Sequence, residues 1–250
     1  MTTVDARAAA AAAAGVAARF DEIFAMIDGW RAGLAGSLAG DAALTTVELD
    51  PLVASFAIPA VSEETLVTGA GFVAAPGILA DAAYHLAWWL RETAADRPPR
   101  RLQAVEDPAN ELFRDYTALE WWRVPAETGA RHLTGPYVDY VCTDDYTVTI
   151  TIPVVVGGTM VGMVGADALV DRLERELLPV LGSAPGPATI VNASARVVTS
   201  TDTHREPGSI LRTPGLAEAV RHPSVEPVAI GDGCEVLACG DTSLALVVGC

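Results

Sequence analysis

Residues 135–167, GPYVDYVCTDDYTVTITIPVVVGGTMVGMVGAD, contain the clearest strand pattern in the 250-residue chain. Threonines alternate there with β-branched apolar residues, in the order Thr147, Val148, Thr149, Ile150, Thr151, Ile152. This period of two predicts a half-buried strand with one apolar and one polar face. The pair Gly157-Gly158 follows, and glycines supply the positive backbone angles of a tight turn, so the stretch predicts an antiparallel hairpin.

Aromatic and acidic residues crowd the approach to this hairpin. They are Tyr137, Asp139, Tyr140 and Asp145. A carboxylate beside an aromatic wall is a suitable environment for a small cation, because negative ring faces attract positive charge. The sequence therefore predicts a lined pocket at the mouth of the hairpin, with Asp145 at its rim.

The order of four sequence blocks resembles the ligand-binding module of the Cache family, sensor domains related to PAS folds. The blocks are Tyr116 with Trp121-Trp122 and Pro125, the segment 135–139, the threonine-rich strand ending at Pro153, and residues 161–167. The resemblance implies an α+β fold, in which a long N-terminal helix precedes two PAS-like modules with antiparallel central sheets. The expected division is 1–45 for a spine helix, 46–182 for a larger ligand-binding module, and 183–250 for a smaller one.

The composition argues against nucleic-acid binding and membrane insertion. Sixteen basic and 32 acidic residues give a formal net charge of −16, which repels a nucleic-acid backbone and an anionic membrane surface. The sequence contains no run of 18 or more apolar residues, so it predicts no membrane span. Asp5 and Arg19 flank the alanine run at 8–14 and argue against a secretion signal, so we expect a cytoplasmic protein. The four cysteines lack a CxxC spacing and are expected to be free thiols.

The N-terminal segment 4–38 is rich in alanine and predicts a helix. Its apolar seam repeats at intervals of four and three residues: Val16, Phe20, Ile23, Ile27, Trp30 and Leu34. Such a seam packs against a partner. Two partners are open at this point: the chain's own modules, or a second copy in a homodimer.

Three further segments precede the hairpin. Pro51 and Pro59 bracket a short apolar helix or turn, and residues 66–73 predict a first strand whose glycines permit close backbone approach. Residues 78–90 predict a helix ending in Trp88-Trp89. Adjacent side chains on a helix point about 100° apart, so at most one tryptophan is expected to face a pocket.

The resemblance also assigns candidate ligand contacts. In the amino-acid-binding branch of the family, an arginine and a tyrosine ahead of the tryptophan hold the ligand carboxylate, but Leu119 and Arg114 occupy those positions here. The residues that bind the ligand ammonium are present. The predicted ligand-binding set is Tyr116, Trp121, Trp122, Tyr137, Asp139, Asp145 and Asp167. The resemblance thus implies a small amine or other cation rather than an α-amino acid.

Several of these residues have plainer interpretations. Asp167 precedes an amphipathic segment at 168–181 and could simply be the N-cap of that helix. Tyr116, Trp121 and Trp122 could fill a core. Arg123 could replace the missing arginine or lie exposed.

The remainder, after a linker-like stretch at 183–187, predicts a small sheet with one helix. Its strands are expected at 188–191, 196–200, 227–230, 234–238 and 244–248, and its helix at 216–221. No nucleotide-binding, hydrolase or metalloprotease motif occurs, and the four histidines show no metal-ligand spacing. We therefore expect a non-enzymatic small-molecule sensor without a cofactor, acting on an unknown output protein. The alternative is an interaction or scaffold protein with a vestigial pocket.

Overall fold

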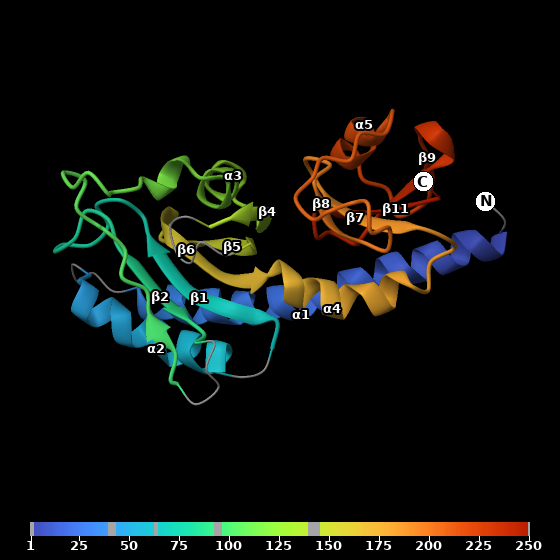
Figure 1. Cartoon of the computed structure of the whole chain (residues 1–250). Helices are drawn as coiled ribbons and strands as arrows, with labels where there is room; N and C mark the ends of the chain where they lie inside the picture. Colours follow the sequence, from blue (N-terminus) through green and yellow to red (C-terminus); the bar gives the residue numbers. More distant parts are fainter. Residues whose placement is uncertain (1–2, 40–43, 63–64, 93–96, 140–145, 250) are drawn as a thin grey trace.

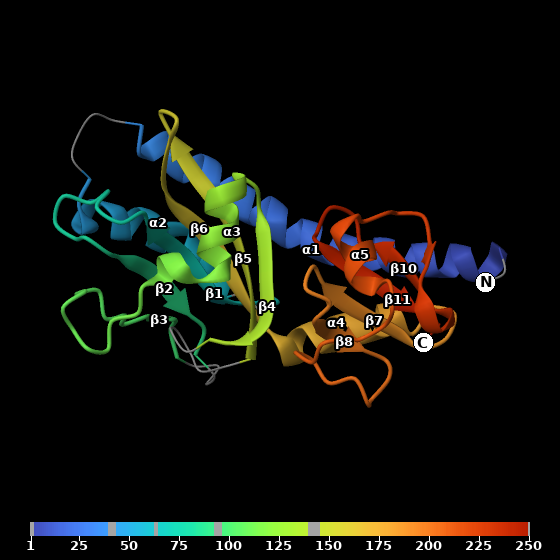
Figure 2. The ribbon, with the colours of Figure 1, turned by 90° about the horizontal axis from the view of Figure 1, so that it is seen from above.

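The computed structural model describes residues 3–39, 44–62, 65–92, 97–139 and 146–249. One long helix, α1 (Thr3–Ser37), runs beneath two antiparallel sheets that lie one after the other along it (Figure 1). Helix α4 (Val170–Leu181) leads the chain from the first sheet to the second (Figure 2) and contacts α1. The predicted α+β class and long N-terminal helix are therefore confirmed.

The predicted seam of α1 packs against the chain itself. Val16, Phe20, Ile23, Ile27 and Leu34 are buried, and Trp30 stacks on Phe56 of α2 (Thr46–Ser62) at 5.0 Å between ring centroids. The core that they join includes side chains from both sheets and from α4. Because this packing covers the seam, a homodimer through α1 would have to use other residues of the helix.

The first sheet has six strands in the order β3-β2-β1-β6-β5-β4, and every neighbouring pair is antiparallel. The strands are β1 (Val67–Ala74), β2 (Leu86–Leu90), β3 (Arg100–Arg101), β4 (His132–Val138), β5 (Tyr146–Val156) and β6 (Thr159–Leu169). The predicted hairpin is β5–β6, and Gly157 and Gly158 turn it with φ angles of 58° and 82°. The predicted first strand corresponds to β1.

The two faces of this sheet are covered differently. Val148, Ile150 and Ile152 of β5 join the core beneath the sheet, with α1 and α2. The opposite face is covered by a second apolar cluster, which includes Trp88 and residues of the single-turn helix η1 (Tyr116–Ala118) and of α3 (Glu120–Thr128). Figure 1 shows α3 above β4, β5 and β6, on the side away from α1.

The polar face of β5 differs from the prediction. Thr147, Thr149 and Thr151 are buried rather than solvated. Helix α3 and the segment of the same chain that precedes it cover that face. Thr151 donates a hydrogen bond of 2.6 Å to the carbonyl oxygen of Trp121 on α3. The strand is therefore buried on both sides.

The helix predicted at residues 78–90 is wrong, because residues 86–90 form strand β2 and residues 78–85 are irregular. Aromatic residues favour strands, and pairing with β1 overrides the weak local preference for a helix. Consecutive strand residues point to opposite faces. Trp88 accordingly joins the second apolar cluster, on the face opposite α1, and Trp89 joins the core on the α1 face. As expected, the two rings do not share a face.

The second sheet has five strands in the order β8-β7-β11-β10-β9. Its elements are β7 (Ala188–Asn192), β8 (Val197–Ser200), α5 (Leu216–Arg221), β9 (Val228–Ala229), the single turn η2 (Gly231–Gly233), β10 (Glu235–Ala238) and β11 (Leu244–Val248). These strands and α5 lie where the sequence predicts them. One face contributes to the core over α1 and α4, and the other packs with α5.

Polar contacts join the two sheets close to β4. Asn192 of β7 donates a hydrogen bond of 2.6 Å to the carbonyl oxygen of Gly135 in β4. Arg131, just before β4, pairs with Asp241 of the β10–β11 turn and lies 4.0 Å from the ring centroid of Phe24 on α1. Strand β4 is thus attached to both α1 and the second sheet.

The predicted free thiols are only partly correct. Cys239 is free and buried, but Cys234 is disulfide-bonded. Cys142 and Cys250 lie outside the described residues. Within the described ranges, no helix has the length and apolar character needed to cross a membrane.

Ile27→Ala should lower the free energy of unfolding by about 2–5 kcal/mol, because it leaves a cavity between α1 and the sheets. Glu22→Ala, at an exposed position of the same helix, is the control and should change stability by about 0.5 kcal/mol or less. Equal effects of the two substitutions in denaturant unfolding would show that the seam contributes little.

Candidate functional site

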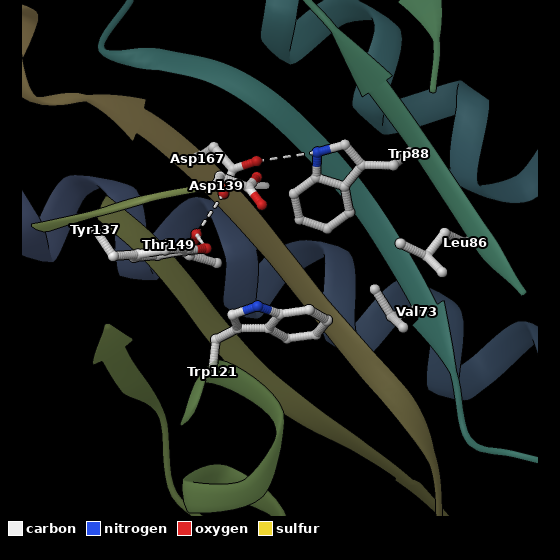
Figure 3. Close-up of a pocket in the computed structure, with 8 residues that line it drawn as sticks. All are labelled: Val73, Leu86, Trp88, Trp121, Tyr137, Asp139, Thr149 and Asp167. Atoms are coloured by element: carbon white, nitrogen blue, oxygen red, sulfur yellow. Dashed lines mark hydrogen bonds between the residues drawn. The ribbon is translucent and has the colours of Figure 1, made fainter. Parts of the chain in front are cut away.

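A narrow pocket lies on the face of the first sheet opposite α1 (Figure 3). Five strands, α3 and the residue after β4 supply its lining: Val73, Leu86, Trp88, Trp121, Tyr137, Asp139, Thr149 and Asp167. The side chains leave room for little more than a water molecule between them. A ligand must therefore move part of the wall to enter.

Asp167 of β6 lies at the acidic end of the pocket. Thr149 donates a hydrogen bond of 2.6 Å to its Oδ1, and the indole Nε1 of Trp88 donates one of 3.2 Å to its Oδ2. The Tyr137 hydroxyl is 2.7 Å from that of Thr149 and continues the network. The N-cap interpretation of Asp167 is wrong, since Leu169 occupies the N-cap of α4.

Asp139 is the second carboxylate and lies beside Asp167 (Figure 3). Both side chains are buried, with exposed fractions of 2% for Asp139 and 4% for Asp167. Burial disfavours the charged carboxylate, and the neighbouring negative charge of Asp139 disfavours it further. Together they raise the pKa of Asp167 to about 7, although its two hydrogen bonds oppose the shift.

Indole rings form the walls of the pocket. Trp88 approaches from β2 and Trp121 from α3, on either side of the cavity in Figure 3. Trp121 is held from behind by stacking on Tyr116 at 6.2 Å and by the hydrogen bond from Thr151 to its backbone. Val73 and Leu86 form an apolar end away from the carboxylates. The pocket therefore changes from acidic to apolar along its length.

The structure brings together four of the seven predicted ligand contacts: Trp121, Tyr137, Asp139 and Asp167. Tyr116 and Trp122 do not line the pocket. They pack in the aromatic cluster behind it, where the Tyr116 hydroxyl donates a 2.6 Å hydrogen bond to the carbonyl oxygen of Ala74. Asp145 lies outside the described residues.

Sequence reasoning did not identify Trp88 and Thr149 as pocket residues. The sequence indicated only that at most one of Trp88 and Trp89 faces a pocket. In the structure, Gly69 of β1 lies against Trp88, and a Cβ at Gly69 would lie 2.8 Å from the indole Nε1 and 2.7 Å from Asp167 Oδ2. Only glycine leaves room for that hydrogen bond. Thr149 belonged to the polar face of β5, which was expected to face solvent.

Basic residues are absent from the described lining of the pocket. Leu119, where the family resemblance expects an arginine, packs against the aromatic cluster. Arg123 has a side chain 52% exposed and pairs with Glu127 at 3.3 Å, so it is not the replacement. In the described part of the chain, no group of three or more acidic, histidine or cysteine side chains is placed to hold a metal ion.

Asp167→Asn should stabilise the unliganded protein at pH 8. The folded protein holds the Asp167 proton up to about pH 7, whereas an unfolded chain releases it near 3.8, so the free energy of unfolding falls as pH rises between these values. Asparagine carries no charge and can keep both hydrogen bonds, because the Thr149 and Tyr137 hydroxyls can reverse direction. Thermal unfolding should show a Tm about 5 °C above wild type at pH 8.

The advantage of Asp167→Asn should shrink towards pH 5.5, where the wild-type carboxyl is neutral. The control is Asp107→Asn, at an exposed aspartate that does not line the pocket. A Tm for Asp167→Asn at or below that of wild type at both pH values would contradict the raised pKa of the Asp167 carboxyl group.

Sequence comparison does not place the chain: no family model and no curated protein matches it. Solved structures do resemble it. A structure described as methyl-accepting chemotaxis protein X matches with a TM-score of 0.61 at 17% identity, covering 98% of this chain and 95% of that one. The ligand-binding domain of the Pseudomonas fluorescens chemoreceptor CtaA, in complex with L-valine, gives a TM-score of 0.60 at 14% identity, covering 98% and 96%.

The ligand-binding domain of the Campylobacter jejuni chemoreceptor Tlp3, in complex with L-norvaline, gives a TM-score of 0.59 at 11% identity. That match covers 96% of this chain and 88% of the other. The Tlp3 and CtaA structures are both described as ligand-binding domains of chemoreceptors. The chain therefore has the fold of Cache-type chemoreceptor sensory domains over nearly its whole length.

Proposed function

We propose that this protein is a small-molecule sensor whose pocket binds a small primary amine. The observation that carries the proposal is the buried pair Asp139 and Asp167 at one end of a pocket walled by Trp88 and Trp121. The resemblance to chemoreceptor sensory domains supports a role in ligand sensing.

Electrostatics favour a cation. Two carboxylates removed from water are stabilised by a positive charge within hydrogen-bond distance, and an ammonium group can donate to both. Ring faces of tryptophan attract the same charge. A quaternary ammonium lacks N–H donors, so a primary amine fits the acidic end better.

The apolar end determines the rest of the ligand. Val73 and Leu86 offer no partner for a second charge, so a short hydrocarbon tail suits them better than a polyamine or an α-carboxylate. The similar receptors Tlp3 and CtaA are described as complexes with norvaline and valine. An amino acid would bring a carboxylate into a described lining without a basic residue. We therefore infer selectivity for the amine over the matching amino acid.

The disulfide at Cys234 bears on where this sensor works. Disulfides persist in oxidising compartments and are rare in the cytosol. The bond therefore favours an extracytoplasmic sensor over the cytoplasmic protein expected from sequence.

A thermal-shift panel tests the ligand class. Each amino acid is paired with its decarboxylated amine: valine with isobutylamine, leucine with isoamylamine, and phenylalanine with phenethylamine. Specific binding raises the Tm by mass action, so at least one amine should raise it and its amino acid should not. Consistent preference for the amino acids would contradict amine selectivity, and no shift with any compound would favour the vestigial-pocket alternative.

Asp139→Asn should weaken binding of the best amine from that panel by more than about tenfold, because it removes a charge-assisted hydrogen bond worth about 1.5–3 kcal/mol. The shape of the side chain is kept, so the fold should survive. Titration calorimetry measures the affinity, with Asp107→Asn as the matched control. Unchanged affinity in Asp139→Asn would remove this residue from the site.

A further inference from the structure

We propose that the pocket exchanges a proton for its ligand: the pair Asp139–Asp167 holds one proton when the pocket is empty, and an incoming ammonium group displaces it. This inference rests on the proposed function, since it requires a cationic ligand. It adds that affinity is linked to pH and that binding acidifies the solution.

The groups that surround Asp167 explain why the empty pocket would hold a proton. The elements around Asp167 present uncharged groups to it: Gly69 from β1, Trp88 from β2, Thr149 from β5 and Trp121 from α3. Tyr137 of β4 and Asp139 are the titratable groups on that side. The described groups in contact with Asp167 thus donate hydrogen bonds to it, and none of them is a cation.

The hydrogen bonds to Asp167 do not replace a charge. Thr149 and Trp88 each donate one neutral hydrogen bond, which favours the carboxylate by less than burial and Asp139 disfavour it. The resulting pKa of Asp167, about 7, means that the pair holds a proton in about half of the molecules at pH 7 and in most of them below that pH. Because the two groups are coupled, the proton belongs to the pair rather than to either residue alone.

The exchange balances without any covalent change in the ligand. A primary amine of pKa about 10 arrives as R–NH₃⁺ at neutral pH. It forms N–H hydrogen bonds to the carboxylates, one O–H bond of the pair breaks, and the proton leaves for the buffer. The net charge inside the pocket is the same before and after binding. Binding therefore creates neither an additional negative charge nor a surplus positive one.

Proton competition predicts a specific pH profile. Below pH 7 the proton opposes the ligand, so affinity for isobutylamine should be about tenfold weaker at pH 6 than at pH 8. Calorimetry at each pH in two buffers that titrate near that pH and differ in ionisation enthalpy, such as phosphate and Bis-Tris at pH 6, gives the number of protons released. We expect about 0.9 at pH 6 and close to none at pH 8.5. Asp107→Asn should behave as wild type.

A second measurement does not need a ligand. Carbon-13 NMR of labelled aspartate carboxyls should show, in the unliganded protein, one titration near pH 7 that disappears in Asp167→Asn. If all aspartates titrate below pH 5, the proposal is overturned whether or not an amine binds.

The calorimetric outcomes separate this inference from the proposed function. Amine binding without proton release at pH 6 would overturn the exchange and leave the amine-binding function standing. No binding of any amine in the panel would overturn both. Proton release that persists unchanged in Asp167→Asn would assign it to another group and also overturn the exchange.

Discussion

The central constraint on this structure is that the β5–β6 hairpin is buried on both faces. Its lower face is apolar and packs on α1, whereas its upper face carries Thr149, Thr151 and Asp167, none of which reaches water freely. Polar groups in that position need partners within the protein. Trp88, Tyr137 and the backbone of α3 supply them. The same contacts that satisfy the strands therefore hold the walls of the pocket in place.

Local patterns in the sequence were sufficient for much of the fold. The hairpin, the seam of α1 and the strands of the second sheet were all predicted, because each depends on periodicity or turn chemistry within a short segment. The burial of Thr149 was not predicted. Periodicity shows which face of a strand is polar, but it does not show whether solvent or another segment covers that face.

The site shows the same limit more sharply. Trp88 and Asp167 are 79 residues apart, and their hydrogen bond exists only because β2 and β6 flank β1 in the sheet. The helix predicted at residues 78–90 did not indicate this contact, since only a strand sends Trp88 and Trp89 to opposite faces. Trp121, Tyr137, Asp139 and Asp167 came from the resemblance to a known family, which carries tertiary information that spacing alone lacks. Tyr116 and Trp122, taken from the same resemblance, support the pocket from behind.

Strand β4 connects the pocket to the rest of the chain. Its C-terminal end carries Tyr137 and leads into Asp139, its middle accepts a hydrogen bond from Asn192 of the second sheet, and Arg131 before it is attached to α1 and the β10–β11 turn. As the last strand of its sheet, β4 is paired with β5 alone among the described strands. A pocket with room for little more than water must open to admit a ligand, and displacing β4 would change the contact between Gly135 and Asn192 at the same time. Tyr137 of the pocket lining and Gly135 of the contact with the second sheet thus lie on one strand, so a shift of β4 would change both.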